Sequence, residues 1–154
     1  MKLYHYTTPG HLERILQDGE IKLATASAPR GTKPVAWVSA NEHFEITALK
    51  KYTNVDNAGN YGSSGCYTFQ EQLDEVGLVR IEVKHYSNLH TWGKLKYSAK
   101  YDEQTYYALE RGGLNVGANP NEWYGSIKPI PAKYFIKIEI YDVDKWVEYE
   151  PKRV

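Results

Sequence analysis

Three residues of this chain combine types that are common in binding and catalytic sites with positions at the edges of expected elements. His5 closes a short aromatic segment, Trp37 stands in a short apolar segment, and Glu122 opens an aromatic segment late in the chain. They offer an imidazole that titrates near neutral pH, an aromatic face and a carboxylate. Each taken alone has a simpler interpretation: a structural histidine, a core aromatic residue and a solvated glutamate at a strand end.

Standard catalytic and metal-binding signatures are absent from the sequence. The five histidines, at positions 5, 11, 43, 85 and 90, form no HExxH or other metal-binding pair, so no bound metal is expected. There is no P-loop, no GxGxxG after a strand and no GxSxG nucleophile elbow. The single cysteine, Cys66, lies in a glycine- and serine-rich stretch and is interpreted as a bystander. Any catalytic site must therefore be assembled from distant segments.

Length and composition favour one globular domain over residues 1–154, with 42% apolar and 25% charged residues. The formal net charge of +0 gives no general attraction to nucleic acid or to an anionic membrane. The opening MKLYHYTT lacks the apolar run of a signal peptide, and no segment approaches the roughly 18 apolar residues of a membrane span. We therefore expect a cytoplasmic protein with no membrane partner.

Signals in the first part of the chain predict a strand, a capped helix and a loop. Residues 2–6 are short and aromatic and favour a strand. Thr8 suits the cap of the following helix, Pro9 its first position, and Gly19 the position just past its end. Residues 24–34 are small and polar and predict a surface loop.

The next stretch predicts a strand, a second helix and a mobile loop. Residues 35–39 are short and apolar, and Ser39 or Asn41 is suited to cap a helix that runs to Tyr52 or close to it. Residues 53–65 are rich in glycine, asparagine and serine and have little to bury, which predicts a mobile excursion.

The second half of the chain predicts mainly strands. Alternating apolar residues favour a strand over residues 79–84, and a helix is expected over residues 102–111, ended by the glycine pair that follows. Residues 122–127 and 134–141 favour two further strands. Strands and helices first and strands last indicate an α+β fold, with a mixed or antiparallel sheet and helices set against it.

Three of these segments together resemble the ADP-ribosyltransferase fold in its diphtheria-toxin and poly-ADP-ribose-polymerase branch. LYHYTTPGHLERILQDGEIKLA resembles a first strand that ends in His, with a small polar residue two positions later and then a helix ending in Gly. PVAWVSANEHFEITALKKY resembles an aromatic-bearing strand that runs into a helix, and NEWYGSIKPIPAKYFIKIEI resembles a strand opened by Glu and paired with a second strand. The family signature of His, Tyr and Glu falls on His5, Trp37 and Glu122. The opening is also similar to the DarT-type DNA-modifying toxins.

The resemblance implies an NAD-dependent mono-ADP-ribosyltransferase and a role for each matched residue. His5 would hydrogen-bond the ribose on the adenosine side of NAD. The backbone of Tyr6 would pair with the nicotinamide carboxamide, with the Thr7 hydroxyl beside it. Trp37 would cover one face of the nicotinamide ring. Glu122 would bind the nicotinamide ribose and stabilise the oxocarbenium-like cation that forms as the glycosidic bond breaks.

Two further residues complete the implied NAD-binding set, and two departures separate this chain from the branch. Ser39 and Arg30 are the additional candidates, with Arg30 directed toward the pyrophosphate. Tyr6 stands where the polymerase branch has Gly, so nicotinamide would approach a bulkier backbone segment. Trp37 replaces the usual Tyr and keeps the aromatic face without the hydroxyl.

Two alternatives stay open, and the acceptor of ADP-ribose is not specified. One alternative is a nucleotide-binding relative of the same fold without transferase activity. The other is an RNA 2′-phosphotransferase-like enzyme, whose arginine-based site has no matching cluster among the arginines at positions 14, 30, 80, 111 and 153. Pro120 stands two residues before Glu122, where arginine-modifying toxins have Glu or Gln, which disfavours an arginine target. A toxin, an anti-defence factor and a tailoring enzyme, acting on protein, nucleic acid or a small molecule, all fit.

Overall fold

The computed structural model describes residues 1–150 and shows an α+β architecture built on one seven-stranded sheet. The strands lie in the order β11-β10-β6-β1-β3-β8-β7, and every neighbouring pair is antiparallel. These strands are β1 (Leu3–Thr7), β3 (Ala36–Ser39), β6 (Val79–Val83), β7 (His90–Thr91), β8 (Trp123–Ser126), β10 (Phe135–Asp142) and β11 (Lys145–Glu148). Two further antiparallel pairs are β2 (Glu20–Ile21) with β9 (Ile130–Pro131), and β4 (Lys51–Val55) with β5 (Tyr61–Cys66). The α+β class expected from the sequence is confirmed.

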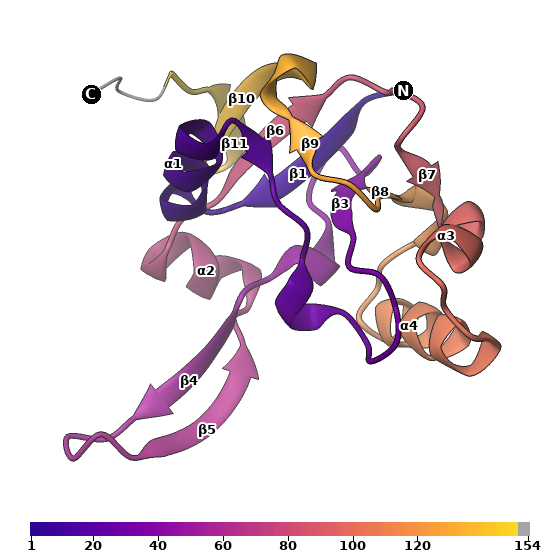
Figure 1. The fold of residues 1–154 in the computed structure, drawn as a ribbon. Helices are drawn as coiled ribbons and strands as arrows, with labels where there is room; N and C mark the ends of the chain where they lie inside the picture. Colours follow the sequence, from indigo (N-terminus) through magenta and orange to yellow (C-terminus); the bar gives the residue numbers. More distant parts are fainter. Residues whose placement is uncertain (151–154) are drawn as a thin grey trace.

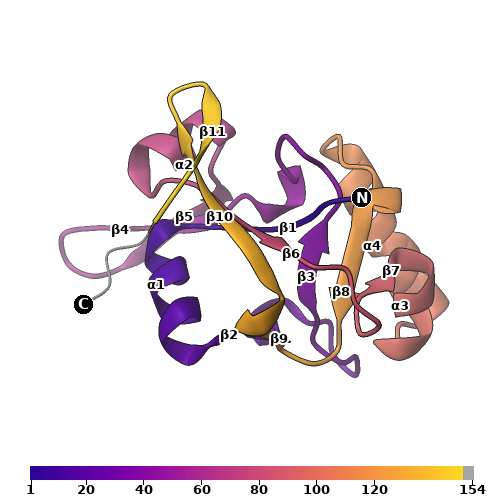
Figure 2. The same ribbon diagram turned by 90° about the horizontal axis from the view of Figure 1, so that it is seen from above.

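Helices flank this sheet at both ends. The helices are α1 (Pro9–Asp18), α2 (Phe69–Glu75), α3 (Trp92–Ser98) and α4 (Glu103–Asn115), and short 3₁₀ turns cover Thr25–Ser27, Ile46–Ala48, Pro120–Glu122 and Ala132–Tyr134. Figure 1 and Figure 2 show α1 beside β2 at one end of the sheet, and α3 and α4 beside β7 and β8 at the other. Within residues 1–150, no helix has the length and apolar character needed to cross a membrane.

The first helix forms where the sequence predicts it, because its local signals are complete. The side chain of Thr8 accepts a hydrogen bond from the His11 main-chain N–H at 3.3 Å, which satisfies one of the free donors at the helix start. Gly19 closes the helix with φ 74°, a left-handed conformation that glycine adopts without strain. Leu12 and Ile15 form its buried face.

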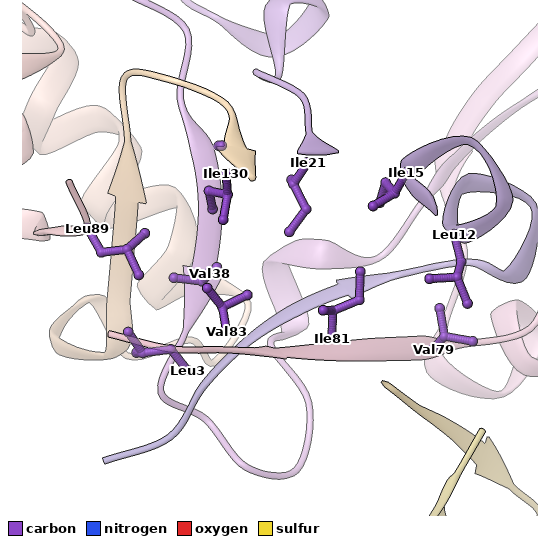
Figure 3. Packing of buried hydrophobic residues seen from close by; sticks show 11 residues of the cluster. Leu3, Leu12, Ile15, Ile21, Val38, Val79, Ile81, Val83, Leu89 and Ile130 are labelled. Atoms are coloured by element: carbon purple, nitrogen blue, oxygen red, sulfur yellow. The ribbon is translucent and has the colours of Figure 1, made fainter. Parts of the chain in front are cut away.

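Two apolar clusters hold the sheet and helices together. In the larger cluster, Figure 3 shows Leu12 and Ile15 of α1 facing strand β6. Its buried members are Leu3, Leu12, Ile15, Ile21, Ala36, Val38, Val79, Ile81, Val83, Leu89 and Ile130. The second cluster lies between the sheet and helices α3 and α4, with buried members Val35, Trp92, Leu95, Ala99, Tyr101 and Trp123. Because side chains alternate along a strand, Ala36 packs in the larger cluster and its neighbour Val35 packs in the second.

The prediction of a second helix up to Tyr52 is wrong. Only the single 3₁₀ turn at residues 46–48 is helical there, and β4 starts at Lys51. The side chain of Asn41 accepts hydrogen bonds from the main-chain N–H groups of His43 and Phe44, which stabilises a turn in place of a helix start.

Residues 53–65 were expected to form a mobile excursion without regular structure, and the structure corrects the second part of this prediction. They form most of the β4–β5 hairpin, which projects from the body of the molecule in both views (Figures 1 and 2). Cross-strand hydrogen bonds link Thr53 to Ser64 at 3.1 Å and Asn54 to Ser63 at 2.9 Å. Polar side chains that have little to bury therefore pair with one another across the hairpin.

The helix expected over residues 102–111 continues through both glycines to Asn115. The reason is tertiary: a Cβ on Gly113 would lie 2.3 Å from the ring of Trp123, so glycine is needed here for close packing. The sequence also missed α2, α3 and β11, although the Thr68–Glu71 capping box of α2 is a readable signal.

Both late strands expected from the sequence are present, as β8 and β10. Phe135–Asp142 is a strand, but Ile136 is exposed because the register shifts between Phe135 and Lys137. Ile138 and Ile140 pack against the larger cluster.

Candidate active site

His5 lies on β1, next to Tyr4. Tyr4 and Ser39 form the one backbone pair between β1 and β3. His5 Nδ1 is 2.8 Å from the main-chain oxygen of Trp37. A carbonyl oxygen only accepts, so Nδ1 carries the proton and donates it. The other nitrogen, Nε2, is then an acceptor, and the ring is only partly exposed.

The charge state of His5 follows from its surroundings. Burial lowers the pKa of His5 from 6.5 to about 4, and the positive charges of Lys50 and His11 act in the same direction, against the opposing effect of the hydrogen bond to Trp37. His5 is therefore neutral at pH 7. Lys50 is half-buried, its charge contributes to the lowered pKa of His5, and burial lowers the pKa of Lys50 itself. Sequence reasoning missed Lys50 because no local pattern distinguishes it.

Glu122 ends the 3₁₀ turn that leads into β8 and is half-buried. Asn41 Nδ2 donates to Glu122 Oε1 at 3.3 Å. The main-chain N–H of Ala40 donates to the Glu122 carbonyl at 2.9 Å. The Glu122 carboxylate is thus hydrogen-bonded to the segment that follows β3, although 81 positions of sequence separate it from Asn41.

Ser39 has its hydroxyl engaged in a structural network. It donates to Glu45 Oε1 at 2.8 Å and accepts from the Asn41 main-chain N–H at 3.1 Å. The second oxygen of the buried Glu45 accepts from Thr47 Oγ1 at 2.7 Å and from Trp123 Nε1 at 3.2 Å. Sequence reasoning missed Glu45 because it resembles a solvated residue of the helix that was expected there.

Trp37 points into the α3–α4 side of the sheet, away from His5. Its ring centroid is 6.2 Å from that of Trp92. It also lines a hollow of about 160 Å³ beneath the loop that precedes β3, together with Pro29, Lys33 and Tyr101. Neither of the other two signature residues, at positions 5 and 122, lines this hollow.

The remaining candidates occupy three different environments. The Tyr6 hydroxyl donates to the main-chain oxygen of Asn41, and its ring lies 5.3 Å from that of Phe44, centroid to centroid. Thr7 is buried at the end of β1. Arg30 is exposed and forms no hydrogen bond or ion pair with any residue of the described range 1–150.

The structure thus joins some of the predicted residues and leaves others apart. His5 contacts the backbone of Trp37, and both Tyr6 and Glu122 contact Asn41. The described residues contain no group of three or more histidine, cysteine, aspartate or glutamate side chains placed to hold a metal ion.

Comparison with known proteins gives no further guide to this arrangement: no family model, curated protein or solved structure matches the chain. The likeness to ADP-ribosyltransferases rests on the three sequence segments alone.

Proposed function

We propose that this chain is an NAD-dependent mono-ADP-ribosyltransferase that cleaves the bond between nicotinamide and ribose and transfers ADP-ribose to an acceptor. The observation that carries the proposal is the 2.8 Å hydrogen bond from His5 Nδ1 to the Trp37 carbonyl. It fixes the tautomer whose Nε2 accepts a hydrogen bond from a ribose hydroxyl. Neutrality at pH 7 keeps that acceptor available.

Glu122 supplies the electrostatic part of the proposed reaction. The C1′–N bond breaks and its electron pair leaves with nicotinamide, which becomes neutral. The ribose carries the positive charge until an acceptor nucleophile bonds to C1′ and gives up its proton. A fixed carboxylate stabilises that developing charge more than it stabilises the ground state. The hydrogen bond from Asn41 limits the freedom of the Glu122 side chain before the reaction starts.

Two structural details support NAD as the substrate. Lys50 carries positive charge close enough to lower the pKa of both His5 and His11, and this charge is suited to the pyrophosphate. The Tyr6 side chain is directed toward Asn41 and Phe44, so its bulk lies away from the backbone that would pair with the carboxamide. The departure from glycine at this position is therefore compatible with nicotinamide binding.

The alternative is a nucleotide-binding relative of the same fold without transferase activity. The observation that favours it is the direction of Trp37, whose ring lines a hollow that neither His5 nor Glu122 reaches. An RNA 2′-phosphotransferase is less well supported, because the buried Arg80 already pairs with Glu139 at 2.9 Å and is not part of an arginine cluster.

Replacing Glu122 with Gln distinguishes a transferase from a nucleotide-binding protein without transferase activity, because the change keeps the shape of the side chain and removes its charge. For a transferase, nicotinamide release should fall by roughly 10²–10³-fold with little change in NAD affinity. The matched control is Glu13→Gln, at an exposed position of α1, which should leave both quantities unchanged. Equal turnover in wild type and Glu122→Gln would remove Glu122 from the mechanism.

The acceptor is the second quantity to measure. Wild-type protein is incubated with labelled NAD and a cell lysate, and the labelled products are then treated with nuclease or protease. Label released by nuclease identifies a nucleic-acid acceptor, label released by protease identifies a protein, and label that is small from the start identifies a small molecule or water. NAD that stays intact while it binds saturably supports the non-transferase alternative.

A further inference from the structure

The loop that follows β3 is held through three consecutive main-chain carbonyls. Each carbonyl accepts a hydrogen bond from a side chain of the seven-stranded sheet. The pairs are Tyr6 with Asn41, Arg80 with Glu42, and Trp146 with His43, the last at 2.9 Å. A loop whose successive carbonyls are all bound by side chains has little freedom to shift relative to the sheet.

The strand register places the three donors together. Tyr6 lies directly opposite Arg80 on β6, and Arg80 lies directly opposite Glu139 on β10, so these side chains share one face of the sheet. Arg80 is buried and donates from Nε to Glu139 at 2.9 Å. Its guanidinium carbon lies 4.1 Å from the ring centroid of Tyr4 and 4.4 Å from that of Trp146. The donors therefore fix one another.

The same loop carries the hydrogen bond to Glu122. Asn41 Oδ1 accepts from the N–H groups of His43 at 2.9 Å and Phe44 at 3.1 Å. That contact fixes the amide plane and turns Nδ2 toward Glu122 Oε1, 3.3 Å away. The position of the loop thus sets the orientation of the candidate carboxylate.

We propose that Tyr6 and Trp146 are positioning residues for Glu122, acting through the loop and Asn41 from the face of the sheet opposite His5. This inference rests on the proposed function for its catalytic consequence, but its structural consequence is independent of it. It also gives Tyr6 a reason to differ from glycine: the hydroxyl holds Asn41 in place.

The structural consequence is tested with Tyr6→Phe and Trp146→Phe, which each remove one hydrogen-bond donor and keep an aromatic ring. The side-chain amide of Asn41 is followed by NMR. We expect its signals to shift and its hydrogen exchange to become roughly tenfold faster in each variant, as the loop opens locally more often. Tyr97→Phe is the control, because Tyr97 is 77% exposed and lies on α3. An Asn41 amide that is unchanged in both variants, with wild-type thermal unfolding, overturns the proposal.

The catalytic consequence is tested by nicotinamide release from NAD. In Trp146→Phe, kcat should fall roughly 10- to 100-fold while KM stays the same, because the carboxylate is misplaced and NAD is still bound. In a Glu122→Ala background the same change should have no further effect, since the residue through which it acts is gone. A loss of the same size in that background would show a merely structural role and overturn the proposal. If wild type releases no nicotinamide, the proposed function fails, and the Asn41 amide alone decides whether the loop is held in this way.

Discussion

His5 donates from Nδ1 to the main-chain oxygen of Trp37 at 2.8 Å, so a side chain links β1 to β3 beyond their single backbone pair. The contact fixes the imidazole tautomer and leaves Nε2 as the acceptor. Burial of this titratable ring in the centre of the sheet lowers its pKa, which makes the stability of the protein depend on pH.

The free energy of unfolding should fall as the pH drops below about 6.5. The pKa of His5 is about 4 when folded and 6.5 in its ordinary state, so between these values the unfolded chain binds a proton that the folded ring does not. The contribution is fully present above pH 6.5 and is lost as the pH falls through 4. It amounts to at most about 3 kcal/mol, because each pKa unit is worth about 1.4 kcal/mol and the ring is partly exposed.

Urea denaturation of wild type and His5→Gln at several pH values measures this contribution. The difference in stability between the two proteins should grow from acid to neutral pH. The other histidines are present in both proteins, so their titration cancels in the difference. A difference that does not change with pH would show that His5 titrates normally in the folded state.

Two adjacent glycines of α4 should respond to alanine with opposite signs. A Cβ on Gly112 meets nothing within 4 Å, so Gly112→Ala should stabilise the protein by about 0.5–1 kcal/mol through better helix propensity. A Cβ on Gly113 would lie 2.3 Å from the ring of Trp123, so Gly113→Ala should destabilise it by about 1–3 kcal/mol. Thermal or urea unfolding of the two variants checks the prediction, and each serves as the control for the other. Changes of the same sign would contradict the packing of Trp123 on this helix.

Replacing the buried carboxylate of Glu45 with an amide should destabilise the protein. Both carboxylate oxygens accept hydrogen bonds, Oε1 from Ser39 Oγ and Oε2 from Trp123 Nε1. Glutamine has only one acceptor oxygen, so its NH₂ group would face one of these donors. We expect Glu45→Gln to lower the free energy of unfolding by about 2–3 kcal/mol, the usual cost of buried donors left unpaired. Chemical denaturation measures it against Glu13→Gln, an exposed change of the same kind. A loss no larger than that of the control would show that Glu45 is not enclosed as described.

The β4–β5 hairpin should be dispensable for folding. Replacing residues 53–64 with an Asn-Gly turn removes side chains that are mostly exposed, so stability should change by less than about 1 kcal/mol. On the proposed function, nicotinamide release should be unchanged and transfer to the native acceptor reduced, because the projecting hairpin offers an exposed surface for acceptor contact (Figures 1 and 2). Labelled NAD with lysate measures both quantities. Transfer at the wild-type rate by the shortened protein would exclude the hairpin from acceptor contact.

The elements that the sequence predicted correctly are those whose signals are local. The start of α1 is marked by Thr8 and Pro9, and its end by Gly19. These signals can be recognised without any distant contact. Strands β1, β3, β6 and β8 were likewise visible as short apolar or aromatic runs. The turn at residues 41–48 was predicted wrongly as a helix, because Asn41 and Glu45 are held by Glu122 and Trp123, which lie far away in sequence.

The candidate site divides in the same way. The sequence by itself determined which residue types were available and the α+β class. It placed His5 at the end of the first strand, whereas His5 is the central residue of β1, and Glu122 lies in the turn just before β8. Only the tertiary structure decided which way Trp37 and Tyr6 point, that His5 is neutral, and that Asn41 bridges to Glu122. Side-chain direction, burial and hydrogen bonding across strands are set by the register of segments that meet only when the sheet is assembled.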